Sequence, residues 1–213
     1  MENPHEKTPG DAEHAGEMVE NSDVKAGRTL ASKRHHPVIH WISQAGEIGD
    51  QGPLYLIGGV VTVTGAFRKD PRCLGAGLAM LAAVGIADLI KSKVKDSVKR
   101  TRPQPAIEKS EYRFETGGSG EKEEQSFPSG HTACTVAAVE AVARFYPRTS
   151  PYLRAASMLM ASSRVAKGKH WPLDLLAGAR IGVASHWLVK WLIPDTLLGK
   201  LGVHSAFRPS LHQ

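Results

Sequence analysis

The sequence predicts an all-α protein, a single helical bundle of about five or six helices that is embedded in a membrane. The chain has 213 residues, a length that suits one domain with a substantial buried interior. Five segments of helix length are rich in small apolar residues, and the first two contain no charged residue. These segments are Pro53–Phe67, Cys73–Ala87, Thr132–Tyr146, Tyr152–Ser163 and Leu175–Ile193.

The region before these segments is hydrophilic. Residues 1–36 contain seven acidic residues and five Lys or Arg, with almost no periodic apolar residues, so we predict a mobile hydrophilic tail. Residues 37–52 place apolar residues among polar ones, which favours an amphipathic helix at a membrane interface, with a soluble surface helix as the alternative. The bundle is assigned to residues 53–200, and residues 201–213 to a C-terminal tail.

The membrane prediction depends on the first two apolar segments. They are joined by a short basic turn, as in a helical hairpin. However, a full span needs about 20 apolar residues, the three later segments contain charged residues or His, and the mean hydropathy of the chain is −0.24. A soluble helical bundle is therefore the alternative fold.

The charge pattern argues against a nucleic-acid partner. The net charge is +6 and the pI is near 9.4, but the basic residues gather at predicted helix ends, and aromatic residues make up only 6% of the chain. A nucleic-acid binder more often has a continuous basic face with interleaved aromatic residues. The two cysteines, Cys73 and Cys134, lie in apolar segments without metal-site spacing, so we expect core residues.

The most informative stretch is Phe127–Thr132, which lies between a charged loop and a long apolar segment. Pro128, Ser129 and Gly130 precede a predicted helix whose first backbone N–H groups lack intrahelical partners, and such a helix start attracts anions. His131 lies in the first turn, where an imidazole can exchange a proton near neutral pH. A simple helix cap with an exposed histidine is the alternative interpretation.

A basic segment precedes this stretch. Residues 91–103 contain a run of Lys and Arg directly after an apolar segment. If the helix of the preceding apolar segment continues through residues 91–103, Lys95, Lys99 and Arg102 share one face, and Pro103 stops the helix after them. We therefore expect a spaced group of cations there.

A third polar segment follows, at residues 163–174. His170 precedes a helix that Pro172 opens, and Asp174 lies in its first turn. A carboxylate four residues on can reach back and accept the second imidazole N–H, which fixes the tautomer and raises the basicity of the ring. A nucleophilic histidine needs this arrangement.

Together, the three segments resemble the three signatures of the type 2 phosphatidic acid phosphatase superfamily. Lys95 to Pro103 reads KxxxxxxRP, Pro128 to His131 reads PSGH, and Ser163 to Asp174 reads SRxxxxxHxxxD, in that order. The resemblance covers about residues 53–193. It implies that His170 attacks phosphorus, that Asp174 orients His170, and that His131 protonates the leaving group. The residues expected to bind the phosphate are Lys95, Arg102, Ser129, Gly130 and Arg164.

The resemblance implies a metal-independent phosphatase with no cofactor, acting on a lipid phosphate or diphosphate through a phosphohistidine. Phosphatidate, phosphatidylglycerol phosphate, isoprenyl diphosphate and a lipid A phosphate are equally possible substrates. It also implies a bacterial inner-membrane protein whose site faces away from the cytoplasm. The alternatives are a soluble acid phosphatase, a vanadate-dependent haloperoxidase-like enzyme, or a non-catalytic protein that binds lipid phosphates.

The remaining charged segments have simpler interpretations. Residues 104–127 read as an irregular loop, a solvated connector or a lid over the site. Lys91, Lys93, Lys99 and Arg100 match no signature position, and we expect them to contact lipid headgroups or solvent. Lys167 and Lys169 are expected to be solvated loop charges, with steering of phosphate as the alternative.

Overall fold

The computed structural model describes residues 9–32 and 36–194, so the predicted C-terminal tail at 201–213 lies outside the described residues. Within them the protein is helical, which confirms the predicted all-α class. The α-helices are α1 (Pro9–Ala31), α2 (Pro37–Ala45), α3 (Gln51–Phe67), α4 (Pro71–Lys95), α5 (Pro103–Glu108), α6 (Gly130–Ala143), α7 (Ser150–Ala166) and α8 (Pro172–Leu192). The short elements are the 3-10 turns η1 (Gly46–Gly49) and η2 (Lys122–Glu124) and the strands β1 (Val98–Arg100) and β2 (Phe114–Thr116).

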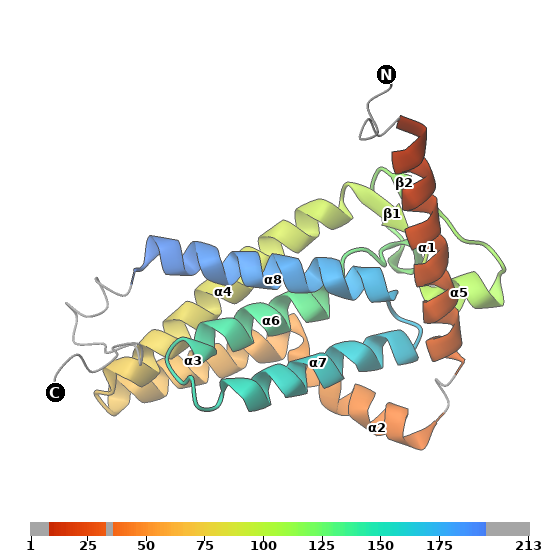
Figure 1. The fold of residues 1–213 in the computed structure, drawn as a ribbon. Helices are drawn as coiled ribbons and strands as arrows, with labels where there is room; N and C mark the ends of the chain where they lie inside the picture. Colours follow the sequence, from red (N-terminus) through yellow and green to blue (C-terminus); the bar gives the residue numbers. More distant parts are fainter. Residues whose placement is uncertain (1–8, 33–35, 195–213) are drawn as a thin grey trace, which may run out of the picture.

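Five long helices, α3, α4, α6, α7 and α8, lie side by side and form the bundle (Figure 1). They correspond to the five apolar segments of the sequence. Helices α3 and α4 form the expected hairpin, with Asp70 capping the N-terminus of α4 through the backbone N–H groups of Arg72 and Cys73. At the same end, the Arg72 side chain donates to the carbonyl of Phe145, which ties this turn to the end of α6.

Small residues let the central helices approach closely. Buried alanines of α4 and α6 form much of the core. Where α8 crosses α6, a Cβ at Gly178 would lie 2.5 Å from the carbonyl oxygen of Ser129, and one at Gly182 would lie 2.6 Å from that of Ala133. Only glycine fits at this approach. The crossing places the first turn of α8 against the start of α6, where Ser129 N–H donates to the carbonyl of Asp174 at 2.9 Å.

The segment between α4 and α6 is more ordered than the sequence predicts. Helix α4 ends at Lys95, and the chain continues as β1, which pairs antiparallel with β2. Arg102 then caps α5. The prediction that Lys95, Lys99 and Arg102 share one helical face is therefore wrong, because Asp96 ends the helix and the next residues form backbone hydrogen bonds to another strand.

The N-terminal segment also differs from its prediction. Residues 9–31 form α1, which stands across one end of the bundle beside β1, β2 and α5 (Figure 1), where the sequence predicts a mobile tail. Asp23 and Ala31 are buried. Gly27 lies so close to the Trp171 ring that a Cβ there would overlap it. Composition alone missed this helix because its attachment depends on a few specific contacts rather than on an apolar face.

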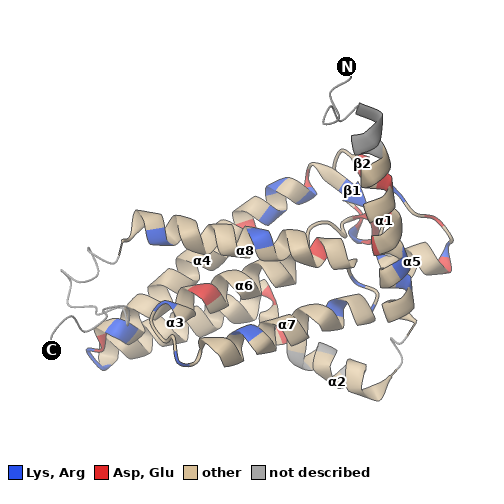
Figure 2. Cartoon of the chain, in the orientation of Figure 1, with Lys and Arg blue, Asp and Glu red and all other residues tan. Residues whose placement is uncertain are grey.

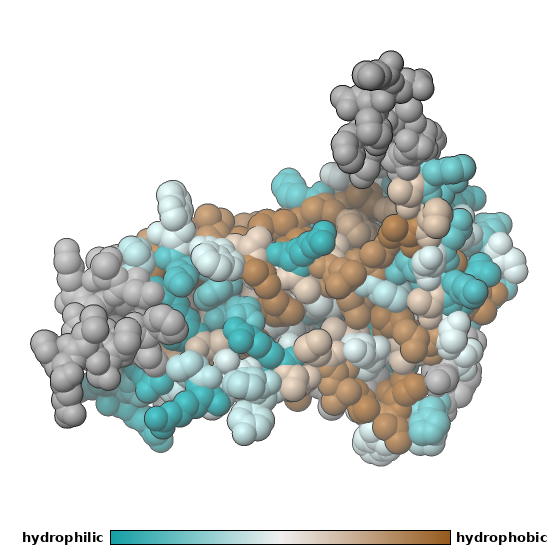
Figure 3. Space-filling view, viewed as in Figure 1, coloured by the Kyte–Doolittle hydropathy of each residue, from teal (hydrophilic) through white to brown (hydrophobic). Residues whose placement is uncertain are grey.

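The bundle carries many exposed apolar side chains. Phe67, Trp187 and Trp191 are 84%, 62% and 76% exposed, and α3 and α7 expose further large apolar residues. Charged residues gather around the strand end and the α3–α4 turn (Figure 2), and apolar residues cover much of the middle of the face in Figure 3. Among the described helices one, α4, is long and apolar enough to cross a bilayer by length and composition.

Candidate functional site

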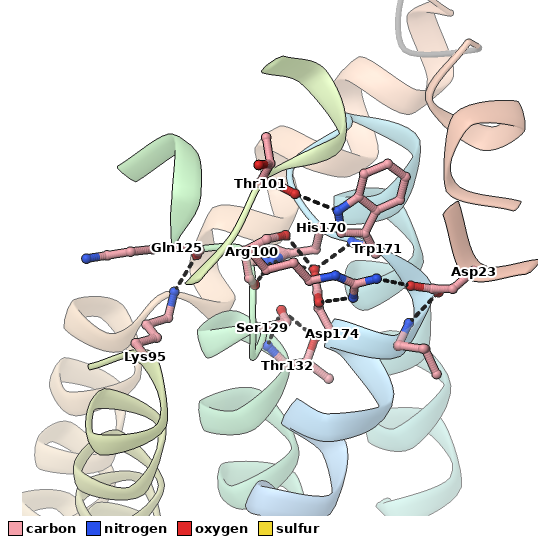
Figure 4. Close-up of polar contacts among 12 residues, drawn as sticks. Asp23, Lys95, Arg100, Thr101, Gln125, Ser129, Thr132, His170, Trp171 and Asp174 are labelled. Carbon is pink, nitrogen blue, oxygen red and sulfur yellow. Dashed lines mark hydrogen bonds and ion pairs between the residues drawn. The ribbon is translucent and has the colours of Figure 1, made fainter. Parts of the chain in front are cut away.

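The three polar segments of the sequence meet at one end of the bundle, beneath α1 (Figure 4). The C-terminus of α4 brings Lys95, the N-terminus of α6 brings His131, and the loop between α7 and α8 brings His170. The charges of Lys95 and Arg102 act on His170, and those of Arg164 and His170 act on His131. Residues far apart in sequence therefore lie close enough for their charges to interact.

His170 is 5% exposed and lies directly before α8. Its Nδ1 lies 2.7 Å from the carbonyl oxygen of Ser126 and 3.7 Å from Oδ2 of Asp174. Because a carbonyl only accepts, Nδ1 carries the proton and Nε2 keeps the lone pair. Burial lowers the pKa of His170, so the ring is neutral at neutral pH. This is the tautomer that a nucleophile attacking through Nε2 requires.

Asp174 is fully buried, and its hydrogen-bond partners differ from the expected one. Oδ1 accepts from Arg100 at 2.6 Å, while Oδ2 accepts from the Ser126 hydroxyl at 2.5 Å and from the Trp171 N–H at 2.8 Å. The expected direct hydrogen bond to His170 is replaced by the Ser126 carbonyl, since 3.7 Å exceeds hydrogen-bond range. Asp174 therefore acts on the ring through its charge and through Ser126.

Arg100 contradicts its prediction as a solvated or lipid-facing cation. It has no exposed surface, and its guanidinium group pairs with Asp174 and with Asp23 of α1, each at 2.6 Å. The rings of Tyr112, Phe114 and Trp171 surround it. In the sequence it is one base in a run of bases, and only the pairing of β1 with β2 turns it inward.

The phosphate-binding candidates include two arginines with spare donors. Arg164 is 2% exposed, and the Nε atoms of Arg102 and Arg164 are buried without a hydrogen-bond partner among the described residues. Burial lowers the pKa of Arg102, because desolvation penalises its charged form. Lys95 donates to the carbonyl of Gln125 at 2.9 Å. Buried cations with unused N–H groups are suited to binding an anion.

His131 lies in a mixed-charge cluster. Arg164 donates through one terminal nitrogen to Nε2 of His131 and through the other to Glu47 at 2.8 Å. Nδ1 of His131 is 3.7 Å from Asp50. Lys169, whose side chain is 41% exposed, also donates to Glu47, at 3.2 Å, so this exposed loop charge contacts the cluster. The hydrogen bond from Arg164 lowers the pKa of Glu47 to about 2. The Glu47 carboxylate thus binds Arg164, which the sequence predicts to bind phosphate.

Ser129 and Gly130 form the start of α6. The Ser129 hydroxyl accepts from the Thr132 hydroxyl at 2.9 Å and caps the helix, so its observed contacts are structural. Gly130 lies beside the Lys91 side chain, whose ammonium group would be 3.5 Å from a Cβ at Gly130. Lys91 pairs with Asp88 at 2.9 Å rather than projecting freely into lipid or water. It is a basic neighbour of the site that the signatures did not indicate.

One group of described residues has the spacing of metal ligands. Glu47, Asp50 and His131 each offer an atom within 4.8 Å of the others. Arg164 already pairs with Glu47 and His131 there, and a guanidinium group disfavours a cation in the same space. Arg164 therefore already occupies two of the three groups that a metal ion would need.

Comparison with known proteins identifies the family. A sequence model of the PAP2 superfamily matches residues 76–197, more than half of the chain. The chain belongs to the PAP2 superfamily. The matched residues include all three signatures, while α1, α2, α3 and the start of α4 precede them.

Two relatives in the PAP2 superfamily are bacterial lipid phosphatases. A lipid A 1-phosphatase of Rhizobium etli is 30% identical over 106 residues, which are 50% of this chain and 45% of that protein. Phosphatidylglycerophosphatase B of Bacillus subtilis is 28% identical over 144 residues, 62% of this chain and 64% of that protein. The chain thus matches about half of the length of the first relative and under two thirds of the second.

Solved structures of PAP2 proteins share the fold. Aquifex aeolicus LpxE superposes with a TM-score of 0.56 at 19% identity, covering 78% of this chain and 92% of that chain. The transmembrane PAP2-type phosphatidylglycerolphosphate phosphatase of Bacillus subtilis gives 0.57 at 22% identity, covering 90% of both chains.

Proposed function

We propose that this PAP2 protein is a phosphatase that hydrolyses a lipid phosphate or diphosphate, without a metal ion, through a phosphohistidine intermediate. One observation carries the proposal. The buried, neutral imidazole of His170 donates Nδ1–H to the Ser126 carbonyl, so its Nε2 lone pair is available beside the charges of Lys95 and Arg102. A phosphate-binding module needs the cations, but it has no need of an oriented nucleophile.

Phosphate binding involves an exchange at Arg164. In the structure its terminal nitrogens are occupied by Glu47 and His131, while its Nε has no hydrogen-bond partner within the described part of the chain. A phosphate brings three oxygens and up to two negative charges, and it competes for the guanidinium group with the single carboxylate of Glu47. Arg102 and Lys95 hold the remaining non-bridging oxygens, where they also stabilise the transition state.

The reaction then proceeds in two steps. Nε2 of His170 forms a bond to phosphorus as the bond to the leaving oxygen breaks, and that oxygen takes a proton from His131. In the second step His131 takes a proton from water, the water oxygen bonds to phosphorus, and the bond to His170 breaks. Nε2 of His131 carries no proton while it accepts from Arg164, so once Arg164 turns to the phosphate this nitrogen first takes up a proton from solvent and then serves both transfers.

We infer that the substrate is a lipid, because both named bacterial relatives act on lipid phosphates and the bundle exposes large apolar residues around it. On this proposal the bundle lies in the bacterial inner membrane and the site faces the extracytoplasmic side, with α2 at the interface. Membrane fractions should retain the protein until detergent is added. Glu47→Cys in intact cells should react with an impermeant maleimide, and labelling only after lysis would place the site on the cytoplasmic side.

The central test is phosphate release. Purified protein in detergent micelles should release inorganic phosphate from phosphatidate, phosphatidylglycerol phosphate, isoprenyl diphosphate or a lipid A phosphate in the presence of a chelator. His170→Ala should abolish release while the melting temperature shows a folded protein. Turnover that survives in this variant would exclude the phosphohistidine. A comparison of the four substrates identifies the preferred lipid.

A further inference from the structure

We propose that Asp23, on α1, is a positioning residue for the nucleophile, acting through Arg100 and Asp174 on His170. The inference rests on the proposed function. It assigns a role in the reaction to an N-terminal helix that lies outside the residues matched by the family model, 76–197.

The contacts form a continuous buried chain (Figure 4). Oδ2 of Asp23 accepts from Arg100 at 2.6 Å, and Arg100 donates to Oδ1 of Asp174 at 2.6 Å. Asp174 in turn accepts from Ser126, whose carbonyl accepts the Nδ1 proton of His170. The side chains of Arg100, Asp23 and Asp174 are 0%, 3% and 0% exposed. Each group in this chain is fixed by the next.

Asp23 makes a second contact that couples α1 to α8. Its Oδ1 accepts the backbone N–H of Leu173 at 2.8 Å, one of the unpaired donors in the first turn of α8. One carboxylate thus holds both the arginine that pairs with Asp174 and the backbone next to it. Gly27 seats α1 against the Trp171 ring, which brings Asp23 within reach.

The charges of this chain favour the attacking state of His170. Asp23 and Asp174 carry two negative charges and Arg100 one positive charge, which leaves a net charge of −1 beside the ring. When Nε2 bonds to phosphorus, the imidazole keeps its Nδ1 proton and becomes cationic. The excess negative charge stabilises that cation in a buried site. Without Asp23, Arg100 would neutralise Asp174, and this stabilisation would be lost.

Other charged groups also face His170. Lys95 at the end of α4, Arg102 before α5 and His131 on α6 oppose protonation of the ring, while Asp174 on α8 favours it. Removing the charge of Asp23 leaves the cations in excess. The acid limb of kcat/KM, which reports protonation of the nucleophile, should then move to lower pH while the plateau falls.

The test compares pH profiles of phosphate release from a lipid phosphate in micelles. We expect Asp23→Asn to lower kcat roughly tenfold and to move the acid limb down by about 0.5 pH unit or more. Asp23→Ser makes the same charge change with a smaller side chain and should move the limb likewise. Asp23→Glu keeps the charge, so its limb should stay at the wild-type position even if turnover falls. Glu17→Gln is the matched control on α1, since Glu17 is exposed and its ion-pair partner among the described residues is His14, at 3.7 Å.

The outcomes separate the possible explanations. A lower plateau with an unmoved acid limb would reduce Asp23 to a structural contact and overturn the inference, as would failure of both neutral variants to fold. An active wild type with an unchanged Asp23→Asn profile would overturn it while leaving the proposed function intact. A wild type that releases no phosphate from any of the four lipids would instead reject the proposed function itself.

Discussion

The pairing of Glu47 with Arg164 predicts that Glu47→Gln binds phosphate more tightly than the wild type. Glu47 accepts from Arg164 at 2.8 Å and from Lys169 at 3.2 Å, and a phosphate has to replace it at Arg164. Glutamine keeps the size of the side chain and removes the competing charge. The site should therefore gain affinity for an anion, and Lys169 should become an additional donor to it.

The magnitude follows from the ion pair after allowance for solvent. The pKa of Glu47 falls from 4.5 to about 2, chiefly through the hydrogen bond from Arg164. Because the side chain is 45% exposed, solvent screening reduces the free energy of this pair to about 1 kcal/mol. Its loss corresponds to a roughly fivefold lower Ki for phosphate. The carboxylate stays ionised above about pH 4, so the effect should be constant from pH 5 to 8 and should weaken with added salt.

The assay is competitive inhibition by inorganic phosphate, with an aryl phosphate as the substrate. Glu111→Gln is the matched control, because Glu111 is an exposed acid whose nearest basic partner, Arg113, lies 3.8 Å away. The control should keep the wild-type Ki. If the Ki of Glu47→Gln stays the same or rises, Glu47 supports Arg164 in its binding position and does not compete with the substrate.

Three further predictions address the acid, the nucleophile and the helix crossing. His131→Ala should slow a lipid substrate far more than an aryl phosphate with a good leaving group, and equal losses on both would exclude His131 as the acid. Because burial lowers the pKa of His170, kcat/KM should fall only below pH 6.5. Below that pH the folded protein binds fewer protons than the unfolded chain, so the melting temperature should also fall as the pH is lowered. Gly178→Ala should cost about 1–3 kcal/mol of stability by forcing α8 away from Ser129. Gly59 has open space around it, so Gly59→Ala should stabilise α3 by about 0.5–1 kcal/mol. Equal melting temperatures for the two variants would contradict the close crossing of α8 and α6.

The bundle helices and the signature residues were accessible to sequence reasoning because their signals are local. Apolar segments mark α3, α4, α6, α7 and α8, and Pro172 marks the start of α8. Because neighbouring helices alternate in direction, the end of α4, the start of α6 and the loop between α7 and α8 lie at one end of the bundle (Figure 1). Which lipid is bound has no comparable local signal.

The contacts that orient His170 could not be predicted in this way. The Ser126 acceptor is a backbone carbonyl, which every residue has, and its position depends on the packing of the whole loop. Arg100 looks like any base in a charged run until β1 and β2 pair, and each of those strands is three residues long. Asp23 lies in a hydrophilic helix, and its contacts with Arg100 and Leu173 have no counterpart in the local sequence pattern.

Helix α4 runs from the candidate active site to the opposite end of the molecule. Its 25 residues span about 38 Å, from Lys95 beside the nucleophile to the turn where Arg72 meets Phe145. Probes attached at Lys69 or Arg148 in the two distal turns would therefore sit a full helix length from the substrate. Those positions offer attachment points for fluorophores or surface tethers that leave turnover undisturbed.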